Sequence, residues 1–426
     1  MRDLSSTKKF VFQIAKLAII AVGLGIYLIA LRSSGTHNMD YYILWTKEFI
    51  HGNLFDLYHV SKGTEQISSV DLTVPYTPFS LYVIGLTAKI LLFFAKESST
   101  LYIIAVNLTC SLFSLATFFL LRSISLWRKT IDPLFYLFSP TVILATPILG
   151  YQDSIMTYFI ILTVILAEKK KFLFCGITSS LAIMSKQLAL MPILAIAIIL
   201  LIKINYRQML YFLFGFFLTT FIVLSPFVIN GFIISYFKSQ ILTSVHTMLS
   251  AGAANFPWVL SLCVRMLKNG FWIGINKGGN LLVIEPDIFR QFTYLIFGVL
   301  VLLIFLIWLK QEMKSTNDLD YFKGASVMLL SYYLFSAGVH ENHIFSILAL
   351  TFALTSYKKG RIIFLLLNIA LFLSLFSNYC MGRSFFYSTS IINYLQKYTT
   401  SITITSLVLY VLALTFINKL KKVQRM

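Results

Sequence analysis

Residues 292–308 read FTYLIFGVLVLLIFLIW, and this stretch contains no charged residue. Residues 16–31 form a second stretch of the same kind, with one lysine at its first position. Neither stretch alternates between apolar and polar positions, as a strand of a transmembrane β-barrel does. Because a segment in lipid must satisfy its own backbone hydrogen bonds, such runs predict membrane-spanning helices.

Runs of this kind fill most of the chain. Its 426 residues are 58% hydrophobic and 12% charged, whereas soluble domains are about 25% charged. Roughly twelve apolar runs are present, and each needs about 20 residues to span a bilayer, so a large soluble domain does not fit. The sequence predicts an all-α polytopic membrane protein with one integral membrane domain over 1–426. Within it we expect a module at 1–230 with a first external loop at 32–78, a long external loop at 231–290 and C-terminal helices at 291–426.

The net charge of +19 does not indicate nucleic-acid binding. The basic residues lie in small clusters between apolar runs, which is typical of cytoplasmic loops next to anionic lipid headgroups. Basic residues also precede the first run, so we expect the N-terminus in the cytoplasm. The loop at 32–78 is acidic after Arg32 and is expected outside. Its residues 41–55 predict an amphipathic helix on the membrane surface, with Ile43, Phe49, Ile50 and Leu54 on its apolar side.

The rule that basic clusters lie in cytoplasmic loops conflicts with the predicted membrane spans at one place. Two full spans between Pro78 and Arg122 would put the Arg122 cluster outside. Either one of these segments is short or re-entrant, or the cluster departs from the rule.

Four places bring polar side chains into apolar surroundings, where a charge costs roughly 2.5–3.5 kcal/mol or more. The first is Asp40, whose carboxylate suits a general base on a hydroxyl and equally suits an ordinary helix-capping aspartate. The second is Gln152-Asp153, in a turn where the dipole of a helix start also favours an acid. Both readings stay open for each residue.

The third place is Lys186-Gln187, where the ammonium can neutralise a phosphate or pair with a buried carboxylate such as Asp153. The fourth is His340-Glu341. An imidazole can bind a phosphate oxygen, transfer a proton or ligate a metal, and a hydrogen-bonded structural turn is a further alternative. Together with His343, this pair contains residue types that bind zinc, but the spacing is not that of the H-E-x-x-H motif. Together the four places predict a polar pocket at one membrane face, able to bind an anionic group on a lipid.

The order of these motifs resembles the GT-C superfamily of integral-membrane glycosyltransferases. It is most similar to the dolichyl-phosphate-glucose-dependent glucosyltransferases and the Gpi18-like mannosyltransferases. The matching segments, in chain order, are Asp40-Tyr41, Tyr76-Thr77-Pro78-Phe79, Gly150-Tyr151-Gln152-Asp153, Ser185-Lys186-Gln187-Leu188-Ala189-Leu190 with Pro192 after it, Ala254-Asn255-Phe256-Pro257-Trp258 and Val339-His340-Glu341. Two departures stand out: Thr77 replaces a proline of the family pattern, and Asn342 replaces a basic residue after the His-Glu pair.

The resemblance implies a GT-C fold with about 11–13 transmembrane helices and surface helices in the external first loop. It implies an inverting hexosyltransferase that moves mannose or glucose from a polyprenyl- or dolichyl-phosphate sugar to a lipid-linked or glycan acceptor. The reaction would take place at the exoplasmic face of a cell membrane or an endoplasmic reticulum membrane. No metal or other cofactor is expected, although a divalent ion is left open.

The resemblance also assigns roles to residues. Asp40 would be the catalytic base, His340 would contact the donor phosphate with Lys186 as a second contact, and Glu341 would orient His340. The supporting and substrate-binding residues would be Gln187, Gln152, Asp153, Tyr41, Tyr76, Pro78, Asn255 and Trp258. The alternative from another class is a transporter or flippase of a lipid-linked sugar, which also needs a cationic pocket near one face.

Overall fold

The chain is described from a computed structural model, which places residues 3–35, 38–52, 54–58, 74, 76–244, 250–270, 287–315, 319–377 and 389–420. Over these residues the regular structure is helical except for one pair of two-residue parallel strands, β1 (Ser250–Ala251) and β2 (Val339–His340). The all-α prediction is confirmed. Three of the described helical stretches are long and apolar enough to cross a membrane: α4 (Ser99–Arg128), α10 (Tyr206–Ile229) and the 400–418 part of α18 (Thr389–Asn418).

The remaining elements follow in chain order. The longer helices are α1 (Asp3–Ala30), α2 (Asn38–His51), α3 (Pro78–Leu92), α7 (Asp153–Glu168), α8 (Phe172–Ser185), α9 (Leu190–Lys203), α11 (Ile233–Ser244), α12 (Phe256–Asn269), α14 (Asp287–Ser315), α15 (Tyr321–Phe335) and α17 (Lys358–Leu375). The short ones are η1 (Asp56–Tyr58), α5 (Leu134–Leu137), α6 (Pro140–Ile143), η2 (Leu144–Ile148), η3 (Gln187–Ala189), η4 (Glu341–Ile344), α16 (Ile347–Phe352) and η5 (Ala353–Ser356).

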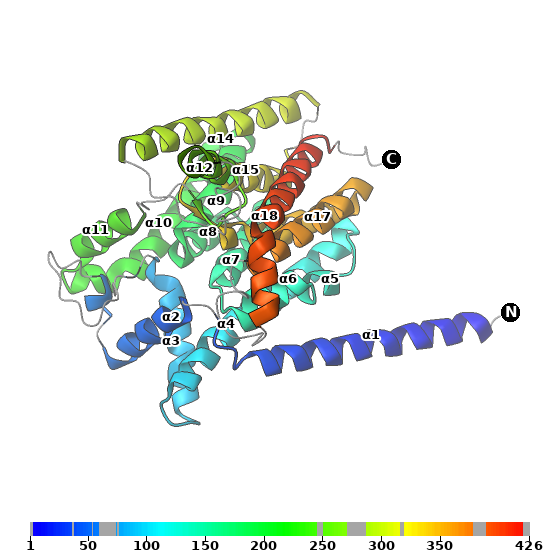
Figure 1. The fold of residues 1–426 in the computed structure, drawn as a ribbon, viewed down its shortest axis with the longest axis horizontal. Helices are drawn as coiled ribbons and strands as arrows, with labels where there is room; N and C mark the ends of the chain where they lie inside the picture. The colour runs from blue at the N-terminus through cyan, green and yellow to red at the C-terminus, as the bar shows by residue number, and fades with distance from the viewer. Residues whose placement is uncertain are drawn as a thin grey trace.

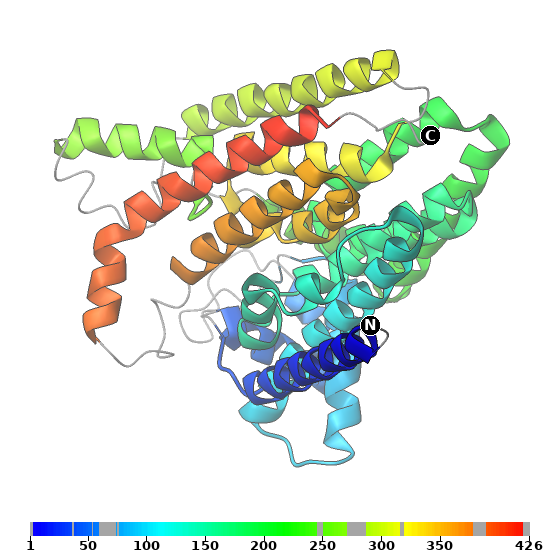
Figure 2. The ribbon, with the colours of Figure 1, turned by 90° about the vertical axis from the view of Figure 1, so that its right-hand side faces the viewer.

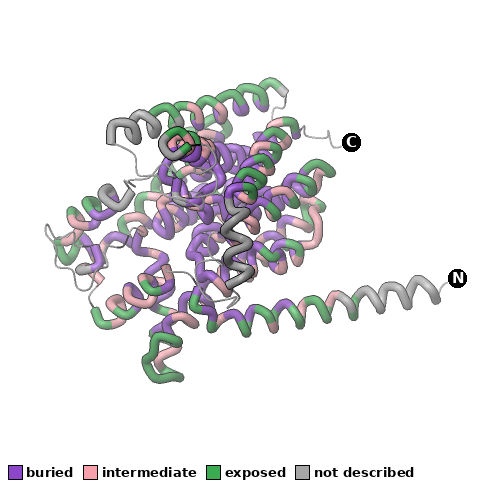
Figure 3. The backbone as a smooth tube through the Cα atoms, in the orientation of Figure 1, coloured by how far each residue is buried: buried purple, intermediate pink, exposed green. Residues whose placement is uncertain are grey.

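The core of the molecule is built around α7 and α15, both of which are apolar on nearly every side. A helix that is hydrophobic all round is buried, and most residues of both helices are (Figure 3). Next to them, α8 and α10 pack closely at two glycines: a Cβ on Gly176 would lie 2.0 Å from the Phe212 carbonyl oxygen, and one on Gly215 would lie 2.2 Å from that of Leu173. Around this core, α1 and α14 run along opposite edges of the molecule (Figure 1).

The segment between Pro78 and Arg122 contains one short helix, α3, followed by the long α4, and the side of the Arg122 cluster stays a prediction. Helix α3 has 15 residues, whereas α4 has 30. The α3 N-terminus is anchored beside the end of α8, where Thr77 Oγ1 donates to the Ile183 carbonyl (2.9 Å) and Ser80 Oγ to that of Ser185 (2.8 Å). From there α3 and the start of α4 form a hairpin that projects from the body (Figure 2). One of the two segments is therefore short, which was the first of the alternatives.

The helix predicted at 41–55 is α2, three residues earlier at its start. Its buried residues are Met39, Tyr42, Trp45 and Thr46. The predicted apolar side at Ile43, Phe49 and Ile50 is only partly buried. The more deeply buried side is a different one, because α2 packs against α3 and α4, with the Phe49 ring beside Gly85. The placement of α2 on a membrane surface stays a prediction.

The segment at 231–290, predicted as a long loop, contains two helices in its described parts, α11 and α12. Its β1 strand pairs with β2, so that Ser250 lies opposite Val339 and Ala251 opposite His340. The pairing ties this segment to the turn that carries His340.

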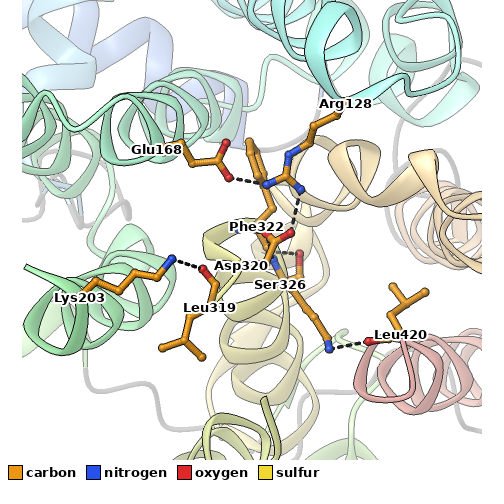
Figure 4. Close-up of polar contacts among 9 residues, drawn as sticks. Arg128, Glu168, Lys203, Leu319, Asp320, Phe322, Ser326 and Leu420 are labelled. Carbon is orange, nitrogen blue, oxygen red and sulfur yellow. Dashed lines mark hydrogen bonds and ion pairs between the residues drawn. The ribbon is translucent and has the colours of Figure 1, made fainter. Parts of the chain in front are cut away.

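Ionic side chains gather where α4, α7 and α9 end and α15 begins (Figure 4). We call this group the far-end cluster: Arg128, Glu168, Lys203, Glu312, Asp320 and Lys323. Arg128 contacts both Glu168 and Asp320, the latter at 2.8 Å. The Lys323 ammonium lies 2.5 Å from the Glu312 carboxylate and also donates to the Leu420 carbonyl, at 2.7 Å.

Candidate functional site

The candidate site begins with a turn that only a glycine allows. The helical run before it ends in η2, which contains Pro147, and Gly150 follows with φ +66°. A Cβ on Gly150 would lie 2.6 Å from the Asn107 side-chain oxygen. Since a positive φ and this close approach both favour glycine, the turn places Asp153 at the first position of α7, completely buried.

Lys186 lies at the break between α8 and η3, where its backbone is extended (φ −160°). Its Nζ lies 2.9 Å from each Asp153 carboxylate oxygen. Both side chains are buried, at 6% and 1% exposure. Of the two readings of Lys186, the pairing with Asp153 is therefore the one that the geometry realises.

A third side chain completes the hydrogen bonds of Asp153. Asn342 Nδ2 donates to Asp153 Oδ2 at 3.0 Å, from a position 189 residues away in the chain. On the other side, the Lys186 ammonium lies 5.4 Å from the centre of the Tyr76 ring, a cation–π contact. We call Tyr76, Asp153, Lys186, Glu341 and Asn342 the site cluster.

Glu341 brings a second carboxyl group into the cluster. Burial raises its pKa to about 8, while the Lys186 charge and the backbone N–H groups of Glu341 and Asn342 act in the opposite direction. For Lys186, burial alone would lower the pKa, but the Asp153 carboxylate outweighs it and the pKa is raised. The ammonium therefore stays charged, and Glu341 holds a proton through neutral pH.

Gln187 takes part in a network that the sequence did not reveal. Its Nε2 donates to Gln240 Oε1. Gln240 Nε2 in turn donates to the carbonyls of Val74 (3.3 Å) and Tyr76 (3.4 Å). These bonds fasten the segment that carries Tyr76 to α11. No local pattern marks Gln240, whereas Asn342 stood beside a recognised motif and was read only as a departure from it.

Asp40 lies in the first turn of α2 and is exposed. The preceding Met39 packs against Gly150: its Cε would lie 2.7 Å from a Cβ there. Two residues after Asp40, the Tyr42 ring lies 6.3 Å from the Tyr76 ring. The first turn of α2, with half-buried Tyr41, is thus placed against the turn that leads to Asp153.

His340 is half-buried at the end of β2. Its backbone N–H donates to His343 Nδ1 (3.3 Å), and the two rings lie 5.1 Å apart. Glu341 turns inward and interacts electrostatically with Lys186 and Asp153. A role for Glu341 in orienting His340 stays a prediction. In the part of the chain that the structure describes, no three His, Cys, Asp or Glu side chains form a group able to hold a metal ion.

Four further predicted residues have architectural positions. Pro78 is the first residue of α3, where its fixed φ suits a helix start. Asn255 is the N-cap of α12: its Oδ1 accepts from the Trp258 N–H (2.9 Å), and its Nδ2 donates to the Ser336 carbonyl (3.3 Å). Trp258 is buried, at 2% exposure. Gln152, also buried, precedes α7.

Direct contacts bring Asp153, Lys186 and Tyr76 together at the start of α7, with Asn342 bonded to Asp153. Asp40 and His340 lie on segments next to them, two residues before Tyr42 and next to Glu341. The arrangement combines a buried cation, an accessible carboxylate and a half-buried imidazole, which together can bind an anion and accept a proton. Comparison of the chain with protein-family models and with curated proteins found no match.

Proposed function

We propose that this protein is an integral-membrane inverting glycosyltransferase of the GT-C type. It would move a hexose from a polyprenyl- or dolichyl-phosphate sugar to a lipid-linked or glycan acceptor at the exoplasmic face. The observation that carries the proposal is the meeting of distant motifs. Asn342, next to the His-Glu pair, bonds Asp153, and Asp153 bonds Lys186, which lies over the Tyr76 ring.

In this proposal Asp40 is the base. It accepts the proton of the acceptor hydroxyl as that oxygen attacks the anomeric carbon, and the bond from that carbon to the phosphate oxygen breaks. Exposure of Asp40 leaves it accessible to an acceptor. A well-placed base contributes about 10²–10⁴-fold to the rate. The products are the glycosylated acceptor, in inverted configuration, and polyprenyl phosphate.

The leaving phosphate needs positive charge. We assign it to His340, which is half-buried at the edge of the site, with Lys186 as the second contact. An ammonium has three donors, and Asp153 accepts two hydrogen bonds from Lys186. Asp153 and Asn342 then keep the ammonium in place while the third donor is directed to the phosphate.

A transporter of a lipid-linked sugar is less well supported. Such a protein needs polar groups along its path through the bilayer. Between Asp153 and Glu168, α7 contains no Asp, Glu, Lys, Arg or His, and α8 contains none over its whole length. The charged residues of α7 therefore lie at its two ends, and α8 has none.

One assay separates the two functions. Purified protein in detergent is incubated with a polyprenyl-phosphate hexose and candidate lipid acceptors, and released polyprenyl phosphate is measured. A transferase releases polyprenyl phosphate without any membrane barrier. A transporter releases none, and moves the intact donor only across sealed vesicles.

A further inference from the structure

The turn between β2 and α16 carries two histidines that hold each other in place. His340 is the N-cap of η4, and His343 is the third residue of that helix. Nδ1 of His343 accepts the backbone N–H of His340 at 3.3 Å, and the side chain of His340 accepts the backbone N–H of His343. This is a capping box, in which two side chains satisfy two backbone donors reciprocally. Both imidazole rings are therefore fixed by the turn itself.

The capping bonds determine which ring nitrogens carry a hydrogen. A neutral imidazole has one N–H donor and one nitrogen that accepts through its lone pair. Because one nitrogen of each ring accepts a backbone N–H, the other nitrogen of each neutral ring must carry the hydrogen. The rings of His340 and His343 thus supply two N–H donors, each on the nitrogen that the backbone does not use.

This hydrogen-bond pattern bears on the choice between a metal ion and an anion at the His-Glu pair. An imidazole ligates a metal ion through a ring nitrogen of its neutral form, and that nitrogen must offer its lone pair. In both rings the lone pair already accepts a capping bond. A metal ion would have to displace that bond, whereas an oxyanion needs the N–H donors that both rings supply.

The surroundings of the two rings favour one shared anion. The ring centres lie 5.1 Å apart with a tilt of 59°, so hydrogen bonds of about 2.9 Å from both rings can reach the oxygens of one phosphate. Both histidines are half-buried, which removes part of the competing water. Glu341, which lies between them in the chain, keeps its proton through neutral pH and therefore does not repel an anion.

We propose that His340 and His343 together bind the phosphate of the polyprenyl-phosphate donor, each through a ring N–H, and that the pair takes no metal ion. The proposal rests on the proposed function for the identity of the anion, and adds His343 as a second imidazole contact. Binding begins with two neutral donors and with Lys186 as the cation. His340 becomes a cation only when it gives up the bond from the His343 backbone N–H, since an imidazolium has no acceptor nitrogen.

The direct test measures binding of polyprenyl phosphate and of uncharged polyprenol to purified full-length protein in detergent. His343→Leu removes the capping acceptor and the donor. It should weaken binding of the phosphate about tenfold, because a hydrogen bond to a charged group is lost, and should leave binding of polyprenol unchanged. An equal loss for both lipids would mean that His343 only supports the fold, and unchanged affinity for the phosphate would also overturn the proposal.

His343→Gln is the matched control. Glutamine at this position of a capping box accepts the N-cap backbone N–H, and its amide nitrogen still donates. The affinity of His343→Gln for polyprenyl phosphate should therefore stay within about threefold of wild type. A loss as large as that of His343→Leu would contradict the role of the donated N–H.

Two further arms separate the possible ligands. In protein without a purification tag, electron paramagnetic resonance during a Cu²⁺ titration should show the same bound copper in wild type and His343→Leu. A nitrogen-ligated copper ion that is lost in His343→Leu would overturn the exclusion of a metal. Competition by inorganic phosphate and by phosphatidic acid distinguishes the carriers of the phosphate. The proposal requires that polyprenyl phosphate binds more tightly than either, and equal competition by either would overturn the assignment to the donor.

Phosphate binding and sugar transfer can fail separately. Binding that depends on His343, in protein that releases no polyprenyl phosphate from the sugar donor, would support the histidine pair and refute the glycosyltransferase proposal. Sugar transfer together with normal phosphate affinity in His343→Leu would refute the histidine pair alone.

Discussion

The site cluster and the far-end cluster lie at opposite ends of α7, about 24 Å apart along its 16 residues, and they balance their charges differently. The far-end cluster has three cations and three carboxylates, and its Asp320 also caps the start of α15, accepting from the Phe322 N–H at 2.9 Å. The site cluster has one ammonium and two carboxyl groups.

Under the proposed function, this difference distinguishes a structural arrangement from a functional one. A balanced group that joins many helix ends fixes their positions. The site cluster retains a protonated Glu341, which follows half-buried His340 in the chain, and its Tyr76 ring lies 6.3 Å from the ring of Tyr42, two residues after exposed Asp40. Burial raises the pKa of a carboxyl group in both clusters, to about 7 for Glu168 and to about 8 for Glu341, so the contrast rests on charge balance and on exposure. Changes at the far end should therefore affect stability, and changes at the site should affect chemistry.

The largest effect on stability is expected at the far end. Arg128→Met leaves Glu168 and Asp320 without their shared cation, and breaking a buried ion pair costs about 3–5 kcal/mol. Thermal unfolding in nanodiscs should show this loss, while turnover per folded molecule stays normal. Arg122→Met, on the same helix outside the far-end cluster, is the control. Unchanged stability of Arg128→Met would mean that the cluster does not hold the helix ends.

At the site cluster, we expect variants that regain stability without regaining sugar transfer. Lys186→Met strands the Asp153 carboxylate and should destabilise the protein by about 3 kcal/mol. The double variant Lys186→Met/Asp153→Asn removes both charges and should recover most of that loss, yet transfer should remain low because the phosphate contact is gone. Recovery of transfer together with stability would show that the pair is only structural.

The raised pKa of Glu341 predicts that the stability of the protein depends on pH. This pKa is about 8 in the folded protein against an ordinary value of 4.5, so the unfolded chain releases this proton first. The contribution of Glu341 to the free energy of unfolding is fully present below about pH 4.5. It is lost as the pH rises to about 8, by up to about 1.4 kcal/mol per pH unit. Glu341→Gln should flatten this slope in unfolding measured from pH 5 to 8, whereas Glu48→Gln should retain it. An equal slope in Glu341→Gln would refute the assignment.

His340→Ala should have the smallest effect on stability, within about 0.5 kcal/mol, because the ring is half-buried. Its effect should fall on binding: the Kd for the polyprenyl-phosphate sugar should rise about tenfold. Exposed His51, which contacts Glu97, supplies the control variant His51→Ala. Normal donor affinity of His340→Ala would remove the phosphate role.

The sequence predicted the charged part of the site because single charges in apolar surroundings must find partners. Lys186 and Asp153 each stood out in that way, and the structure pairs them. Gln240 did not stand out, since an amide on an ordinary helix becomes part of the site only through its contacts with Gln187 and the Tyr76 segment.

The far-end cluster escaped prediction for a related reason. Arg128, Lys203 and Lys323 follow the pattern of cytoplasmic loop cations, and only the packing of helix ends shows their acceptors. The buried side of α2 was not predicted, because its partners, α3 and α4, follow it in the chain and decide which residues are covered.

The central claim is that Asp40 takes a proton during sugar transfer. The most direct test compares Asp40→Asn with Glu48→Gln, two charge-removing changes on the same helix, by measuring polyprenyl phosphate released per minute from a polyprenyl-phosphate hexose. The account predicts that Asp40→Asn loses about 10²–10⁴-fold in turnover with unchanged affinity for the polyprenyl-phosphate hexose, and that Glu48→Gln retains wild-type turnover. Wild-type turnover in Asp40→Asn would contradict it.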